Sequence, residues 1–125
     1  MVVTAESALR SAGASTGPAA RWVTELPSNL ADAVPLVRVA VIGGNGEDFA
    51  AFTNPRIDFD CFDTPREDAR DLAYRVRAWV RSLPGQMAGG AFVLRVQNDN
   101  EPNWVPYDNT NLRRFVYTAQ LRLHT

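Results

Sequence analysis

The chain has 125 residues, a net charge of −1 and 46% hydrophobic residues, which is typical of one globular domain. A chain of this length forms a core without disulfides. The near-zero charge disfavours a protein that grips nucleic acid through its phosphates. The single Cys61 excludes an internal disulfide and a multi-cysteine zinc site, and the single His124 leaves little for histidine-based catalysis. No apolar run reaches the length of a membrane span, so we expect no membrane partner.

Residues 1–20 are predicted to form an N-terminal segment, and residues 21–125 a single α+β domain. This first segment lacks the basic start and apolar stretch of a secretory signal. Thr4 can cap a short helix over residues 5–12, although alanines and Leu9 supply its whole apolar stripe. Residues 11–18 are typical of a linker because they are rich in Ser, Gly and Thr and end in proline.

Five segments with β-branched or alternating apolar residues are predicted strands. They are residues 21–26, 36–42, 56–62, 91–98 and 115–123. In the last of them, alternation assigns Phe115 and Tyr117 to the core side, which leaves no exposed aromatic platform there for RNA. Cys61 also alternates with apolar residues, so we expect a buried thiol rather than a nucleophile.

Residues 65–83 carry the strongest helix signal of the chain. Thr64, Pro65 and Glu67 match a capping box with proline at the first helical position. Apolar residues follow at three- and four-residue spacing as far as Leu83, where Pro-Gly ends the pattern. The opposite face carries several arginines and is predicted to be solvated.

This order of elements predicts an α+β fold. Its sheet is expected to be largely antiparallel, with four to five strands, and to be covered on one face by one long helix, with a weak N-terminal helix in addition. The other sheet face would carry charged residues that can pair across strands: Arg38, Asp58, Asp60, Arg95 and Arg122. Two interpretations stay open, a water-facing ladder of ion pairs and a subunit interface or lumen wall.

Residues 43–55 have no periodicity and are predicted to form a loop. Loops of this length inside a compact domain are uncommon and often functional. The segment is either a flap that contacts a partner or a simple hairpin connection. The candidate flap residues are Gly43, Gly44, Asn45, Gly46, Asp48 and Phe49. The glycines follow a strand but lack the lysine and the helix of a phosphate-binding loop.

No catalytic constellation is evident in the sequence, and no cofactor is implied. Asp58, Asp60 and Asp63 are the best candidates for a metal site, although Asp63 falls outside the alternation shared by the other two. A second group of interest is the loop with Trp104 and Tyr107, followed by Arg113 and Arg114. Aromatic residues and arginine are enriched at protein interfaces. The alternative is that Trp104 folds back onto the edge of the core.

Three runs of spaced residues resemble one known family. They are Leu26-Pro27 with residues 34–39 and Gly43-Gly44; residues 56–62 leading to Arg66, Ala69, 71–73 and 76–78; and residues 102–108 with Arg113-Arg114-Phe115 and a closing strand. Together they resemble the tail terminator, or tail completion, proteins of long-tailed bacteriophages that infect actinobacteria. The exclusive use of arginine among the basic residues agrees with a GC-rich genome.

The resemblance implies a non-enzymatic virion protein that forms a ring, commonly of six subunits. Such a ring ends the tail tube and joins the tail to the head, and DNA passes through its lumen without sequence-specific binding. The implied partners are other copies of the chain, the tail tube protein and a head–tail connector protein. The implied location is the head-proximal end of the tail in the virion, and the host cytoplasm during assembly.

Three alternatives remain at this stage. The first is another head–tail connector ring protein, a stopper. The second is a small metal-dependent enzyme that uses Asp58, Asp60 and Asp63. The third is a monomeric binding module that uses the loop with Trp104 and Tyr107.

Overall fold

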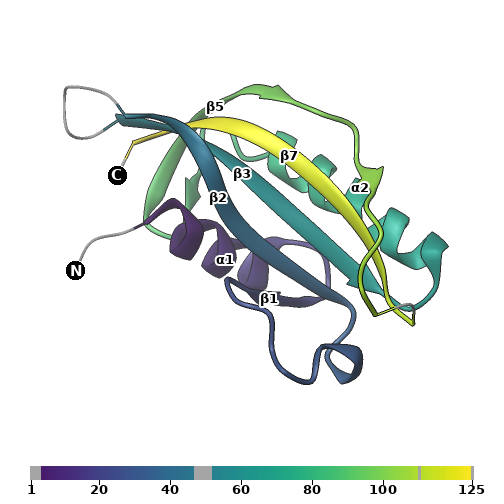
Figure 1. The fold of residues 1–125 in the computed structure, drawn as a ribbon. Helices are drawn as coiled ribbons and strands as arrows, with labels where there is room; N and C mark the ends of the chain where they lie inside the picture. The colour runs from purple at the N-terminus through teal and green to yellow at the C-terminus, as the bar shows by residue number, and fades with distance from the viewer. Residues whose placement is uncertain (1–3, 47–51, 110, 125) are drawn as a thin grey trace.

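The computed structural model describes residues 4–46, 52–109 and 111–124. Two α-helices, one short 3-10 helix and seven strands are present in this part of the chain (Figure 1). In chain order they are α1 (Ala5–Thr16), β1 (Arg21–Val23), η1 (Leu30–Asp32), β2 (Leu36–Gly46), β3 (Phe52–Asp63), α2 (Arg66–Arg81), β4 (Met87–Ala88), β5 (Ala91–Asp99), β6 (Asn103–Trp104) and β7 (Arg113–His124).

The seven strands form one curled sheet, and this corrects the predicted fold class. The strand order is β1-β2-β3-β7-β5-β4, and β6 pairs with β7. β1 and β2 run parallel while the other pairs are antiparallel, so the sheet is mixed. The architecture is a half-barrel with two helices, and the prediction of one long helix over a largely antiparallel sheet of four to five strands is wrong. Strands β4 and β6 are two residues long, too short to leave a periodic signal in the sequence.

The main core lies on the inner face of the curled sheet. α2 packs there against β3 and β7 with its predicted apolar stripe, including Leu72, Val76 and Val80, which are fully buried. Phe115 and Tyr117 are buried on the same face, as their alternation predicted. The helix begins one residue later than expected: Pro65 holds the cap position without a side-chain cap bond, so the predicted capping box does not form.

Helix α1 closes the open side of the half-barrel. It contacts β1 and β2 near one edge of the sheet and β4 at the other edge (Figure 1). Thr4 caps it as predicted, and the helix runs on to Thr16, through most of the residues predicted as a linker. Its small residues allow a close approach to the rest of the core: Ala8 and Leu9 are fully buried, and Gly13 lies against the indole of Trp22.

The predicted loop over residues 43–55 is largely a continuation of the β2–β3 hairpin. Gly43 and Gly44 pair with Arg56 and Pro55 after a shift in register behind Val41. Both glycines have positive φ, and a Cβ at Gly44 would collide with the backbone of β3, so only glycine carries the strand through this point. The expectation of a loop is therefore wrong for Gly43, Gly44, Asn45 and Gly46, which belong to the hairpin strand, while Asp48 and Phe49 lie outside the described residues. A role of this segment as a flap that contacts a partner stays a prediction.

Gly13→Ala is expected to lower the free energy of unfolding by about 1–3 kcal/mol, because the added methyl group must displace Trp22 in a packed core. This loss exceeds the gain of up to about 1 kcal/mol in helix propensity. Urea unfolding followed by circular dichroism measures the change. Ser15→Ala, at an exposed position of the same helix, is the control and should change stability by less than about 0.5 kcal/mol.

Candidate functional site

The candidate site is an aromatic and arginine cluster at the end of the sheet where β3 ends and β7 begins. Trp104 lies on β6, which pairs with β7 at Phe115. The Trp104 side chain remains 43% exposed, and the Arg66 guanidinium at the start of α2 lies 4.5 Å from its ring centroid. A hollow of about 480 Å³ opens here and is lined by Arg66, Trp104, Pro106, Tyr107, Leu112 and Arg113. We call it the Trp104 hollow.

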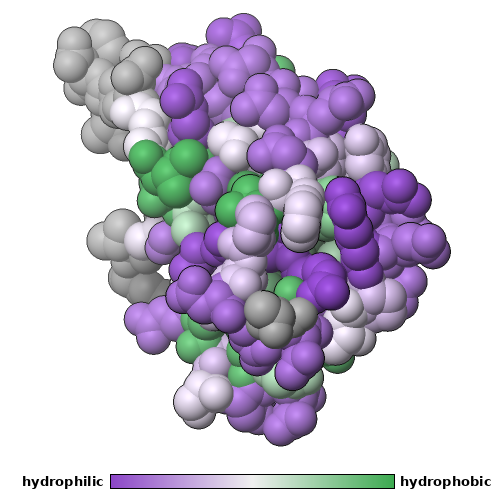
Figure 2. All heavy atoms as spheres, turned by 45° about the vertical axis from the view of Figure 1, so that its right-hand side comes forward, coloured by the Kyte–Doolittle hydropathy of each residue, from purple (hydrophilic) through white to green (hydrophobic). Residues whose placement is uncertain are grey.

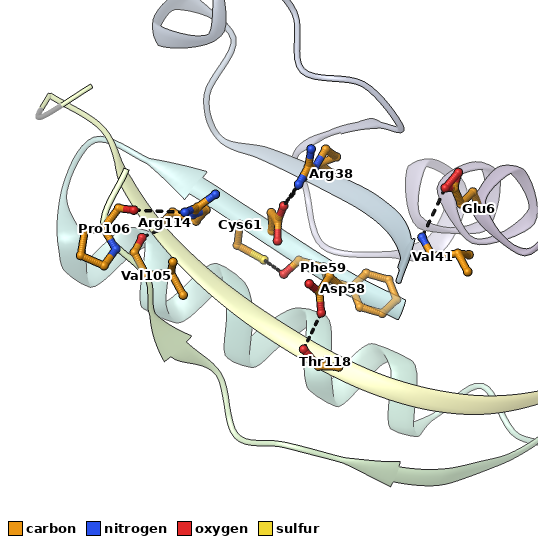
Figure 3. Close-up of polar contacts among 11 residues, drawn as sticks. Glu6, Arg38, Val41, Asp58, Phe59, Cys61, Val105, Pro106, Arg114 and Thr118 are labelled. Carbon is orange, nitrogen blue, oxygen red and sulfur yellow. Dashed lines mark hydrogen bonds and ion pairs between the residues drawn. The ribbon is translucent and has the colours of Figure 1, made fainter. Parts of the chain in front are cut away.

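The loop before β7 holds the floor of the Trp104 hollow in place. Tyr107 packs edge-on against Phe62 with ring centroids 5.1 Å apart, within a second apolar cluster on the outer sheet face. Arg114 lies over the Tyr107 ring at 5.2 Å and donates to the carbonyl oxygens of Val105 and Pro106 at 3.4 and 3.1 Å (Figure 3). Arg114 therefore serves to fix the loop, while Trp104 and Arg66 form the accessible part of the cluster.

The alternative that Trp104 folds back onto the edge of the core is wrong, and Tyr107 is the aromatic residue of the loop that packs inward. Tyr107 faces the protein and is half-buried, whereas Trp104 faces outward. Arg113 is half-buried and donates to the Leu112 carbonyl at 3.3 Å. Arg66 was not among the predicted interface residues, since its contact with Trp104 joins a helix start to a strand far along the chain. In the view of Figure 2, strongly hydrophilic and near-neutral side chains lie side by side, with only small hydrophobic patches between them.

The charged residues predicted on the outer sheet face differ in their surroundings. Asp60 is 3% exposed and forms an ion pair with Arg38 across β2 and β3 (Figure 3). Asp58 accepts a hydrogen bond from the Thr118 hydroxyl on β7. Arg95 is exposed on β5 and lies opposite Arg122, so no carboxylate faces it in register. The structure thus joins Arg38 and Asp60 in one pair and leaves Arg95 apart from them.

The candidate metal ligands do not converge. Asp58 and Asp60 follow the outer face of β3, while Asp63 lies at the strand end, where its carboxylate accepts from the Thr64 amide at 2.8 Å. Within residues 4–46, 52–109 and 111–124, no group of three or more His, Cys, Asp or Glu side chains is arranged to hold a metal ion. In the same ranges, no helix is both long and apolar enough to cross a membrane.

Cys61 is fully buried, and desolvation together with the neighbouring Asp60 carboxylate raises the pKa of its thiol far above the usual range. The thiolate is the reactive form of cysteine, so we expect Cys61 of the native protein not to react with a thiol reagent such as DTNB at pH 8. The same protein should release one equivalent of thionitrobenzoate in urea. Rapid labelling of the native protein would contradict the buried position.

The strongest electrostatic cluster in the described structure involves a residue that the sequence analysis missed. The Asp99 carboxylate on β5 accepts from Tyr117 at 2.7 Å and from Arg81 at 2.9 Å, and Arg77 approaches at 3.4 Å. The hydrogen bond from Arg81 is the main reason that the pKa of Asp99 lies well below its usual value. Arg77 and Arg81 are therefore not simply solvated, as predicted for this face of α2, but anchor the helix to β5 and β7 through Asp99.

A comparison of the sequence with models of known protein families finds no match, and a comparison with curated proteins finds no similar protein.

Proposed function

We propose that this protein is a structural subunit of a ring that ends the tail tube of a long-tailed bacteriophage and joins the tail to the head. The observation that carries the proposal is the exposed Trp104 beside Arg66, in a hollow that Pro106, Tyr107 and Leu112 also line. A large aromatic side chain and arginine at a partly exposed hollow have the composition of an interface hot spot. The tail tube protein, a connector protein and further copies of the chain are its proposed partners.

Two further points support this proposal. The predicted metal-binding carboxylates do not converge, so the alternative of a metal-dependent enzyme gains no support from the geometry. The net charge of −1 suits a lumen through which DNA slides without sequence-specific binding, since the 13 basic residues are not in excess over the 14 acidic ones. The proposed ring has six subunits and sits at the head-proximal end of the tail.

The proposal is tested by the native mass of the protein in light scattering over a concentration series, with and without purified tail tubes. We expect a closed oligomer near six subunits, formed by the protein alone or only on the tubes. Electron microscopy should then show it at tube ends; rings found on head connectors instead would identify a stopper. A monomer at every concentration that ignores the tubes would overturn the proposal and favour a monomeric binding module.

A further inference from the structure

Four side chains, three of them exposed and that of Phe52 half-buried, form a row across neighbouring strands at the end of the sheet opposite the Trp104 hollow. Strand register places Phe52, His124, Phe92 and Met87 side by side on β3, β7, β5 and β4. Their neighbours Leu123, Val93 and Ala88 are buried in the core, so the row lies on the outer face. Met87 is 64% exposed and Phe92 is 37% exposed. We call these four residues the apolar row.

Arginines border the apolar row. Arg122 lies with its guanidinium 5.0 Å from the Phe52 ring centroid, and Arg95 lies opposite Arg122 on β5. Arg56 is exposed on the same outer face of β3, four residues after Phe52. In the described part of the chain, neither Arg56 nor Arg95 forms an ion pair. Methionine, aromatic residues and arginine are the residue types enriched at the centre of a protein–protein interface.

The other end of the same strands offers a complementary surface. β3 runs from Phe52 to Asp63, eleven residue steps or about 36 Å at the usual rise per residue. Next to the Trp104 hollow is a second hollow of about 530 Å³, lined by Pro35, Asp63, Asp68, Asp71 and Arg75. Asp63 pairs in register with Arg113 of the Trp104 hollow, so the two hollows adjoin. One is aromatic, and the other carries three carboxylates and one arginine.

We infer that the apolar row of one copy docks on the two adjoining hollows of a second copy, in a head-to-tail contact. The row would cover Trp104, and Arg95 and Arg56 would face the carboxylates of Asp68 and Asp71. A ring needs two unlike patches on each subunit, and these two lie at opposite ends of the longest strands. A contact between the apolar rows of two copies would bring their arginines together, and this repulsion between like charges would oppose association. This inference rests on the proposed ring and names the surfaces that form it.

Two variants, each with one damaged end, test the contact. Phe92→Ala/Arg95→Glu damages the row, and Trp104→Ala/Asp68→Asn damages the hollows without supplying an opposite charge to the altered row. Each variant alone should lose self-association in sedimentation velocity. An equimolar mixture should form a dimer of one copy of each and stop there, because only one intact row and one intact hollow surface remain to meet. Tyr74→Ala, at an exposed residue of α2 that lines neither hollow, is the control and should assemble like the wild type.

Melting curves of all variants establish that they are folded. Variants that assemble like the wild type would overturn the inferred contact and leave the proposed ring intact. A mixture that stays monomeric, while the wild type assembles, overturns the contact in the same way. Wild-type protein that grows into open chains and ignores tail tubes would keep the contact but remove the proposed function. A last outcome concerns nucleic acid. If the wild type binds a labelled oligonucleotide, and Phe92→Ala/Arg95→Glu abolishes this binding while its oligomer mass stays that of the wild type, the row binds nucleic acid instead and the inference is overturned.

Discussion

Replacing Asp99 by alanine is expected to lower the free energy of unfolding by about 2–3 kcal/mol. The Asp99 side chain is 8% exposed and accepts charge-assisted bonds from α2 together with the hydroxyl of the buried Tyr117. Its removal leaves that hydroxyl without its acceptor and two arginines without their shared carboxylate. Losing a hydrogen bond to a charged group costs about 1.5–3 kcal/mol, and water can replace part of the contact at the more exposed Arg81. Urea unfolding measures the loss.

Asp99 should also make stability depend on pH in the acid range. Because its pKa is lower in the folded protein than in the unfolded chain, the ionised carboxylate stabilises the fold above about pH 4. This contribution is lost as pH falls below the unfolded pKa and toward the folded one. Between about pH 4.5 and 2, the free energy of unfolding should fall more steeply in the wild type than in Asp99→Asn. Parallel curves for the two proteins would contradict the role assigned to Asp99.

Local pattern was sufficient to predict the long helix and the five longer strands, because each buries one face with a regular period. Alternation placed Phe59, Cys61 and Tyr117 in the core, and all three are fully buried. Glycines misled the prediction at the β2–β3 hairpin, since Gly44 maintains the strand at a φ that other residues avoid. The N-terminal helix gave a weak signal because its buried face has one large apolar residue, Leu9, and otherwise consists of alanine and glycine.

The surfaces of the molecule were harder to predict because they depend on register. Met87, Phe92, Phe52 and His124 come from four strands, and no local pattern relates them. Arg66 and Trp104 meet only because β6 pairs with β7 near the start of α2. Asp99 likewise meets Arg77 and Arg81 across about twenty positions of chain. Sequence reasoning identified Trp104, Tyr107, Arg113 and Arg114 by residue type, and their role at an interface stays a prediction.

Trp104→Ala is expected to weaken assembly while leaving the fold intact. The Trp104 side chain is 43% exposed and belongs to neither core cluster, so its loss should change the free energy of unfolding by less than about 1 kcal/mol. A hot-spot residue at an interface contributes about 2 kcal/mol or more, which corresponds to a loss of roughly 30-fold in affinity between subunits. Sedimentation equilibrium, with urea unfolding in parallel, separates the two effects.

The matched control for Trp104 is Tyr74→Ala. Tyr74 is an aromatic residue with similar exposure, 41%, on the outer side of α2 and lines neither hollow. It should assemble with wild-type affinity. Arg66→Lys tests the contact with the Trp104 ring in turn, because lysine keeps the charge but loses the planar group that stacks on the indole. We expect it to weaken assembly less than Trp104→Ala. Wild-type affinity in Trp104→Ala would show that the hollow is not the interface and would remove the observation on which the proposed ring depends.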